Sequence, residues 1–391
     1  MIKPFREKIE YGGCMVGQEE REAILRVIDN QGMRRWTIGP ESVEFEKELA
    51  KTTGVDYAVL CNSGSSALLL AISALKLPKG SKVIIPALNF PTAYSSILQA
   101  GLMPVVVDCD IDTFNLSMGE VQRALMLHPD VMAIVAINVA GNCVSLELLR
   151  DIADTCNPNI KIVLDNCDGY GGTLNDQFID VYADVSCISM HAAHIISMGE
   201  GGAVLTSNKE IADRARKMRE WGRASGSDTI TKHEGFPPDY RERYVYDEIG
   251  WNMKPLELQC AMGRVQLKKL QSFKKKRAKN YYSLWPYFEG DKFNRVSSHP
   301  AAEPCWFAFP FLCKGLDRPY VMKELEEHNI EVRTVFSGNV LKHPAYKNEP
   351  HIQIGPLTNS NEVMKSGMFI GVPPIMTDEM VSYVGKLVQS L

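Results

Sequence analysis

Short apolar runs alternate with helix-like segments through the first half of the chain, and this alternation constrains the fold more than any other feature. The runs identified as strands lie at residues 57–61, 82–86, 101–108, 131–139, 161–164, 184–190 and 203–206. A buried strand followed by a helix is typical of a chain that returns to a parallel neighbouring strand. The sequence therefore predicts an α/β protein whose mostly parallel central sheet is covered by helices on both faces.

The chain is long enough for two domains, because 391 residues can bury more than one core. A long helical pattern extends to about residue 288, and its basic run 268–277 is interpreted as an exposed helix face. We predict a large domain over residues 1–250, and over residues 251–391 a linking helix with a small C-terminal α+β domain. Gly32 is predicted to end the first helix, and residues 224–244 are predicted to form a long loop.

Composition excludes several classes of protein. The net charge is −4, which gives no general attraction for nucleic acid or for an anionic membrane. No apolar run approaches the length of a bilayer span, and the first eight residues lack the apolar core of a signal peptide. We therefore predict a cytoplasmic protein with no nucleic-acid or membrane partner.

Ten cysteines could form disulfides, bind metal or fill the core. They include no C-x-x-C pair, and most lie in apolar runs. Reduced and mostly buried thiols are therefore favoured.

The stretch 189–202 has the strongest signature of chemistry. The apolar run before it ends near His191 and His194, and a glycine-rich turn containing Glu200 follows. Open α/β sheets bind ligands beyond the ends of their strands, which is where these histidines are predicted to lie. Metal binding by His191, His194 and Glu200 is an alternative. Their loose spacing matches neither H-E-x-x-H nor a two-metal carboxylate pattern, so this alternative ranks lower.

A second turn, at residues 62–66, follows the first predicted strand. Gly64 permits a tight turn, while Ser65 and Ser66 offer hydroxyls and helix N-terminal N–H groups that suit a phosphate. An N-cap by Ser63 or Ser65 accounts for the same residues. The residues alone favour the N-cap, followed by a helix over 67–77.

Asp165 and Phe90 each follow a predicted strand. An aspartate at this edge of a sheet either caps a turn or contacts a ligand, and the residues alone leave both readings open. A phenylalanine is ordinarily a core residue.

Taken in chain order, these motifs resemble the DegT-type sugar-nucleotide aminotransferases, a branch of the fold-type I pyridoxal-phosphate enzymes. In that family the stretch matching 189–202 carries the lysine that forms a Schiff base with the cofactor. His194 stands at that position here, and no lysine occurs between Lys161 and Lys209. A histidine there resembles a smaller subgroup, the sugar-nucleotide 3-dehydratases, which use pyridoxamine phosphate. The resemblance implies a fold-type I transferase that binds pyridoxal or pyridoxamine 5′-phosphate.

The resemblance also implies roles for individual residues. The turn of Gly64, Ser65 and Ser66 would bind the cofactor phosphate, Phe90 would stack on the pyridine ring, and Asp165 would face the ring nitrogen. Ser189 would also contact the cofactor.

Two further residues would complete this cofactor site. Asp168 would lie near the cofactor hydroxyl, and Asn252 would reach across a homodimer interface to the partner's cofactor phosphate. Asp168, Lys254 and the segment 330–344 resemble the dehydratases more than the aminotransferases. Ala192 and Ile195 depart from that subgroup, which usually has proline and a second histidine there.

The implied activity is removal of the C3 hydroxyl from a nucleotide-bound 4-keto-6-deoxyhexose, with a GDP sugar preferred. His194 would be the catalytic base, and L-glutamate would regenerate pyridoxamine phosphate. No iron–sulfur cluster is expected, because residues 221–230 lack the cysteines that bind it in one kind of 3-dehydratase. The alternatives are a nucleotide-sugar aminotransferase, a metal-binding protein, or a non-catalytic protein on the same fold.

Overall fold

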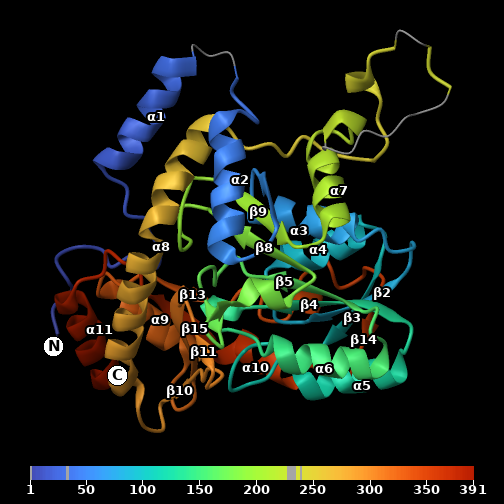
Figure 1. Cartoon of the computed structure of the whole chain (residues 1–391). Coiled ribbons are helices and arrows are strands. Elements are labelled where there is room, and N and C mark those ends of the chain that lie inside the picture. Colours follow the sequence, from blue (N-terminus) through green and yellow to red (C-terminus); the bar gives the residue numbers. More distant parts are fainter. Residues whose placement is uncertain (1, 32–34, 227–234, 238–239) are drawn as a thin grey trace.

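The computed structural model describes residues 2–31, 35–226, 235–237 and 240–391 (Figure 1). Its largest sheet has eight strands in the order β1-β9-β8-β5-β4-β2-β3-β14. The strands are β1 (Tyr57–Cys61), β2 (Lys82–Pro86), β3 (Met103–Val107), β4 (Val131–Ile137), β5 (Lys161–Asp165), β8 (Val185–Ser189), β9 (Gly202–Thr206) and β14 (Ile352–Gln353). All neighbouring pairs from β8 to β14 are parallel, and β9 runs antiparallel to both β1 and β8. The predicted mostly parallel sheet is therefore confirmed.

Alternate residues of these strands face two separate cores. Ile84 and Val105 pack with α5 (Met118–Leu127) and α6 (Leu146–Cys156) on one face. Val83 and Val106 pack with α3 (Gly64–Ala74), α4 (Pro91–Gln99) and α7 (Lys209–Arg219) on the other. Such near-continuous apolar strands suit a parallel sheet with both faces covered. Figure 1 shows α5 and α6 below the sheet and α3, α4 and α7 above it.

The second sheet has four antiparallel strands in the order β10-β12-β15-β13. Its strands are β10 (Phe293–Arg295), β12 (Ala308–Cys313), β13 (Val332–Thr334) and β15 (Gly367–Gly371). Helices α9 (Arg318–Glu327) and α11 (Asp378–Ser390) complete its core, and α10 (Thr358–Ser366) lies beside it. A smaller sheet joins β11 (Ala302–Glu303), β6 (Thr173–Leu174) and β7 (Gln177–Phe178).

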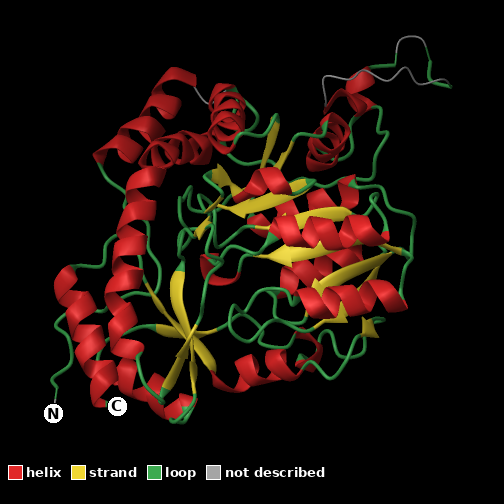
Figure 2. Cartoon of the chain, turned by 60° about the horizontal axis from the view of Figure 1, so that its bottom comes forward, coloured by secondary structure: helices red, strands yellow, loops and turns green. Residues whose placement is uncertain are grey.

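Helix α8 (Glu257–Leu284) connects the two cores (Figure 2). Its first half packs against α1 (Gln18–Gln31) and α2 (Pro40–Thr53), and its last turns pack against α11. The predicted domain boundary between residues 250 and 251 stays a prediction. One strand from the C-terminal part of the chain, β14, pairs with β3 in the large sheet. None of the described helices is both long and apolar enough to cross a membrane.

The structure also differs locally from the sequence predictions. Helix α5 was not predicted, although Ser117 caps it by accepting a hydrogen bond from the Glu120 N–H. Helix α3 begins at Gly64 rather than at residue 67. The predicted helix end at Gly32 and part of the predicted loop 224–244 lie outside the described residues.

The basic run 268–277 was only partly interpreted correctly. Lys268, Lys275 and Lys276 are exposed as expected. Arg277 is fully buried, because the helical repeat turns that position toward the protein interior.

Candidate active site

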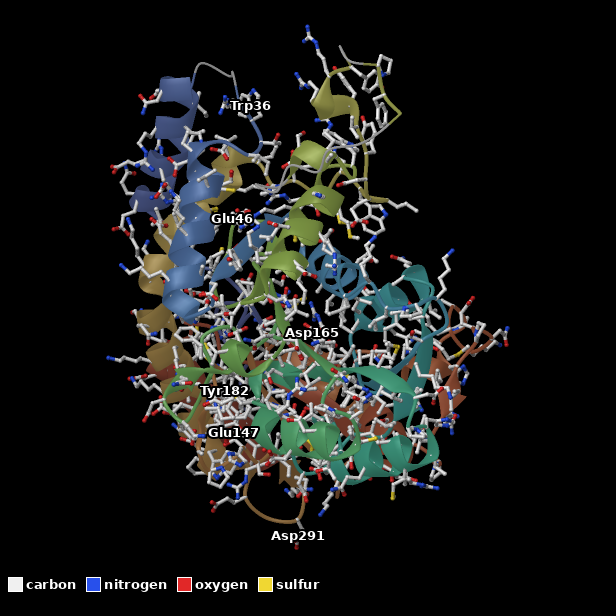
Figure 3. The ribbon with its side chains drawn as sticks, turned by 45° about the vertical axis from the view of Figure 1, so that its right-hand side comes forward. Trp36, Glu46, Glu147, Asp165, Tyr182 and Asp291 are labelled. Carbon is white, nitrogen blue, oxygen red and sulfur yellow. The ribbon has the colours of Figure 1, made fainter. Side chains whose placement is uncertain are left out.

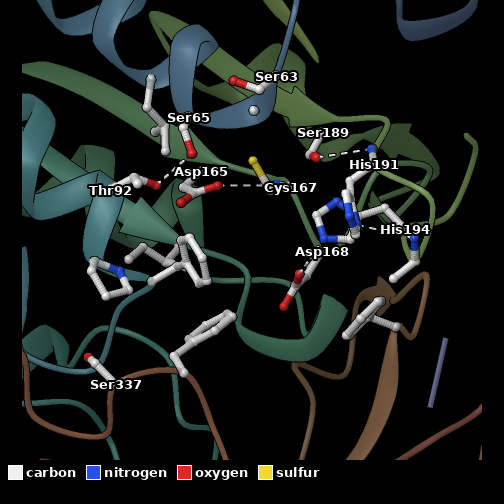
Figure 4. A pocket seen from close by; sticks show the side chains of 18 of the residues that line it. Ser63, Ser65, Thr92, Asp165, Cys167, Asp168, Ser189, His191, His194 and Ser337 are labelled. Carbon is white, nitrogen blue, oxygen red and sulfur yellow. Dashed lines mark hydrogen bonds and ion pairs between the residues drawn. The ribbon is translucent and has the colours of Figure 1, made fainter. Parts of the chain in front are cut away.

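A cavity of about 610 Å³ opens beyond the carboxyl ends of the parallel strands (Figure 4). Loops after β1, β2, β4, β5 and β8 form one wall, and segments near β13 and β15 form the other. Tyr11, from the N-terminal segment, also lines it. Seven predicted site residues meet here: Gly64, Ser65, Phe90, Asp165, Asp168, Ser189 and His194.

The N-terminus of α3 forms one end of the cavity. The Ser63 side chain accepts a hydrogen bond from the Ser66 N–H at 3.1 Å, which confirms the predicted N-cap. A Cβ atom on Gly64 would lie 2.7 Å from the Ser189 Cβ and 2.8 Å from the Cys167 Sγ, so only glycine fits there. The capped turn also lines the cavity, and phosphate binding by this turn stays a prediction.

Asp165 ends β5 and lies deep in the molecule (Figure 3). Burial raises the pKa of its carboxyl, while hydrogen bonds from Cys167 oppose that effect. The Cys167 N–H donates to its Oδ1 at 3.2 Å. Among the described residues no cation pairs with this carboxylate, so a ligand with a cationic ring N–H would complete its surroundings.

The side chains of His194 and Asp168 face each other in the lining of the cavity (Figure 4). Their Nε2 and Oδ1 atoms are 3.7 Å apart, and the Ala140 N–H donates to the other Asp168 oxygen at 3.2 Å. Burial lowers the pKa of His194 to about 3, with the charges of His191 and Arg277 adding to the effect. Burial and the Asp165 charge raise the pKa of Asp168 to about 7. The His194 imidazole is therefore neutral at pH 7 and able to accept a proton.

The His194 ring is held by aromatic contacts as well. It meets the Phe307 ring edge-on at 5.4 Å between centroids and the His191 ring at 5.7 Å. The His194 Nδ1 atom is buried and has no hydrogen-bond partner among the described residues.

His191 and Glu200 form a separate contact at 3.7 Å between Nε2 and Oε1. The Ser189 Oγ accepts a hydrogen bond from the His191 N–H at 3.3 Å and so fixes the start of this turn. No group of three or more His, Cys, Asp or Glu residues in the described chain has an arrangement that could hold a metal ion. The structure therefore offers no support for metal binding by His191, His194 and Glu200.

Phe90 is not a core residue. The residue is 53% exposed, and its side chain lines the cavity and meets the Phe336 ring edge-on. The expectation from residue type alone is wrong here, because hydrophobicity does not distinguish a packed core from a cavity wall.

Two predicted residues do not line the cavity of their own chain. Ser66 is tied to Ser63 within the α3 cap. Asn252 is exposed, and its Oδ1 accepts a hydrogen bond from Lys254 Nζ at 2.7 Å. The Lys254 ammonium lies 3.2 Å from the centroid of the Trp221 ring.

Other cavity residues were not assigned roles from the sequence. They include Tyr11, Thr92, Asn138, Cys167, Arg333, Ser337 and His343. Arg333 is the one lysine or arginine among the described residues that line the cavity. Its guanidinium lies 4.5 Å from the centroid of the Tyr11 ring and pairs with Glu331. Its place in the segment 330–344, already singled out by its resemblance to the dehydratases, was a usable signal.

A profile of the DegT/DnrJ/EryC1/StrS aminotransferase family matches residues 15–389. The chain belongs to this family. The predicted fold class, a pyridoxal-phosphate-dependent transferase fold with a mostly parallel sheet, is confirmed by this match and by the solved structures described below.

Curated relatives in this family differ in activity. The lipopolysaccharide biosynthesis protein RfbH of Salmonella typhimurium is 33% identical over 95% of this chain and 89% of its own. The dTDP-4-dehydro-2,6-dideoxy-D-glucose 3-dehydratase of Saccharopolyspora spinosa is 32% identical over 96% of this chain and 85% of its own. The GDP-perosamine synthase of Caulobacter vibrioides is 27% identical over 86% of this chain and 84% of its own.

Two solved structures of a GDP-4-keto-6-deoxymannose-3-dehydratase resemble the chain closely. One, a histidine-to-asparagine mutant with bound GDP-perosamine, has a TM-score of 0.90 and 28% identity, covering 97% of this chain and 100% of its own. The other holds a trapped PLP-glutamate geminal diamine; its TM-score is 0.89 and its identity 27%, covering 97% of this chain and 99% of its own.

Proposed function

We propose that the protein is a pyridoxamine-phosphate-dependent sugar-nucleotide 3-dehydratase. Its substrate would be a nucleotide-bound 4-keto-6-deoxyhexose, from which it removes the C3 hydroxyl. The observation that carries the proposal is His194, which lies in the cavity at the position where most of the family has the cofactor-binding lysine. None of the described residues that line the cavity is a lysine.

The residues of the cavity fit the cofactor. The N-terminus of α3, with Gly64 and Ser65, would bind the phosphate, since helix N-termini attract anions. Asp165 would pair with the ring nitrogen, and Phe90 would cover one face of the ring. When bound, pyridoxamine phosphate supplies an amine that condenses with the sugar ketone and a ring that accepts electrons.

His194 would move the proton at the reacting centre. An imidazole that is neutral at pH 7 has a free lone pair for a proton, whereas a lysine with an ordinary pKa of about 10.4 is already charged there. The protonated imidazole would be stabilised by Asp168 at 3.7 Å. The proton could then pass from His194 to the C3 hydroxyl, which leaves as water. Without a lysine to release an amino sugar, the reaction would end in dehydration.

The substrates are anionic, and Arg333 suits them. It is the one lysine or arginine among the described cavity residues, and a guanidinium binds carboxylate and phosphate groups well. We assign it to the anionic groups of L-glutamate and of the nucleotide sugar. A GDP sugar is preferred because the two solved neighbours act on one, although a relative's name specifies a dTDP sugar.

The active form would be a homodimer. Asn252 is exposed and lies outside the cavity of its own chain, as expected of a residue that serves the partner's cofactor phosphate.

A product analysis tests the function. The protein is incubated with pyridoxal phosphate, L-glutamate and each of the GDP, CDP, UDP and dTDP 4-keto-6-deoxy sugars, and the products are identified by mass spectrometry. We expect a 4-keto-3,6-dideoxy sugar nucleotide and ammonia. A stable 4-amino sugar that keeps its C3 oxygen would establish the aminotransferase alternative. Cofactor binding without any reaction would favour a non-catalytic protein.

The variant His194→Asn completes this test. It should bind the cofactor yet lose deoxygenation by about 10²- to 10⁴-fold, the usual contribution of a general base. Near-normal turnover would contradict the role of His194.

A further inference from the structure

Arg277 is a fully buried arginine on α8 that belongs to none of the assigned roles. Its Nη1 donates hydrogen bonds to the carbonyl oxygens of Trp306 at 3.3 Å and Phe307 at 3.0 Å. Its Nη2 donates to the His194 carbonyl oxygen at 3.4 Å. One side chain thus joins the linking helix to the catalytic turn and to the segment that enters β12.

The same segment also supports Asp168. The Phe307 N–H donates to the Ala140 carbonyl at 3.0 Å, and the Ala140 N–H donates to Asp168 Oδ2 at 3.2 Å. The Phe307 ring packs edge-on against the His194 ring. Both members of the His194–Asp168 pair are therefore connected to Arg277, His194 directly and Asp168 through Phe307 and Ala140.

The cost of burying this guanidinium suggests that it serves a purpose. The described residues offer Arg277 no ion-pair partner, and its Nε atom has no hydrogen-bond partner among them. An unpaired buried charge is expensive for a folded protein. Burial lowers the pKa of Arg277 to about 10, so the guanidinium is still charged at neutral pH.

We propose that Arg277 is a positioning residue of the reacting centre, which holds the His194 turn against the start of β12 and keeps the imidazole opposite Asp168. This inference rests on the proposed function for its kinetic consequences. Arg277 does not line the cavity, so it acts through His194 rather than on the substrate.

The charge of Arg277 also influences His194, in addition to its hydrogen bonds. Three ionisable groups lie around His194: the His191 ring from its own turn, the Asp168 carboxyl from the loop after β5, and the Arg277 guanidinium from α8, which bonds to the His194 carbonyl oxygen. After burial and His191, the Arg277 charge is a further influence that lowers the pKa of His194. Removing that charge should therefore raise the pKa of His194.

Three variants separate the two contributions. Arg277→Met removes both the charge and the hydrogen bonds. Arg277→Lys keeps the charge, but the lysine side chain is shorter and its single ammonium group cannot reach all three carbonyl oxygens. Lys275→Met is the control, because it removes an exposed charge from the same helix. The imidazoles are labelled with ¹⁵N and titrated by NMR without added cofactor, and His194→Asn assigns the His194 signals. Steady-state deoxygenation is measured on the holoenzymes across the pH range.

Arg277→Met should raise the pKa of His194 and move the acid limb of the kcat profile to higher pH. Both Arg277 variants should lower kcat by about 100-fold, the cost of a small misplacement, and change KM for the nucleotide sugar by less than about threefold. Arg277→Lys should change the ¹⁵N chemical shifts of the His194 imidazole, while the pKa of His194 stays near that of the wild type. Lys275→Met should match the wild type in every measurement.

If Arg277→Lys shows the same His194 signals and the same kcat as the wild type, the proposal is overturned. This variant alone gives the answer if Arg277→Met does not fold. An equal loss in Lys275→Met would also overturn it. If the wild type transaminates instead of dehydrating, the proposed function fails. The NMR titration still tests the placement of His194 in that case.

Discussion

The His194 Nε2 atom lies 3.7 Å from the Asp168 Oδ1 atom, yet the pKa values of the two side chains are shifted in directions that oppose an ion pair. Asp168 becomes charged only near pH 7, whereas His194 is charged only near pH 3 and below. At every pH, therefore, at most one of the two carries its charge. The pair becomes oppositely charged only when His194 takes up a proton during the reaction.

Asp168→Asn should stabilise the cofactor-free protein in a pH-dependent way. A carboxyl whose pKa is raised by folding destabilises the folded state progressively as pH rises from its unfolded value of about 4 to its folded value. The variant's advantage should be absent at pH 4, grow up to pH 7 and stay level above. A rise in the pKa of Asp168 from about 4 to about 7 corresponds to a change of at most about 4 kcal/mol in the free energy of unfolding.

Urea denaturation of both proteins at pH 4, 6 and 8 measures this effect. The same variant should lower kcat, because the protonated His194 loses its counter-charge. An unchanged stability difference between pH 4 and pH 8 would show that Asp168 ionises normally.

Gly64→Ala should weaken cofactor binding and stability together. The new methyl group would meet Ser189 and Cys167 at less than 3 Å, and overpacking of this kind costs about 1 to 3 kcal/mol. Gly119→Ala is the matched control, since a Cβ there meets nothing within 4 Å and alanine favours a helix. Thermal denaturation and a cofactor titration compare the variants. Equal behaviour of the two would contradict the close packing at Gly64.

Much of the fold follows from local sequence patterns, whereas the site depends on contacts between distant segments. Apolar runs between helices predicted the sheet because burial on both faces leaves a continuous hydrophobic signal. Residue type alone favoured a core position for Phe90 and an exposed one for Arg277, and the structure contradicts both expectations. Which side a single residue faces depends on how α8 and the second sheet pack, and residue type does not encode that.

The resemblance to a family supplied information that residue patterns could not. Asp165 lines the same cavity as Ser189 and His194, although it lies in a different segment of the sequence. Arg333 had no assigned role: its segment was noted for its resemblance, but the place of Arg333 on the cavity wall depends on how the segment around β13 packs opposite the large sheet.

Borohydride reduction should leave the cofactor unattached to the wild-type chain. Covalent attachment requires an amine in the cavity, and the described lining residues include no lysine. His194→Lys supplies one, and its reduction should add the cofactor mass to the intact protein while dehydration is lost. Intact-mass spectrometry checks both proteins. A reduced adduct on a wild-type lysine, or retained dehydration in His194→Lys, would contradict the assignment.

Mixing two inactive variants should restore activity if Asn252 serves the partner's site. His194→Asn subunits lack the base, and Asn252→Ala subunits fail to support their partner's cofactor at limiting cofactor concentration. In a mixed dimer, the site with an intact His194 receives an intact Asn252 from its partner, whereas the other site lacks both. Random reassociation of equal amounts makes half of the dimers mixed.

Such a mixture should therefore show about a quarter of the wild-type activity, well above the mean of the two variants alone. Subunits are exchanged at low protein concentration, and light scattering confirms that dimers form again. Activity no greater than that mean would show that Asn252 acts within its own subunit or not at all, and an active monomer would exclude the shared site. Because Asn252 is exposed and lies outside its own cavity, restoration is the result we expect.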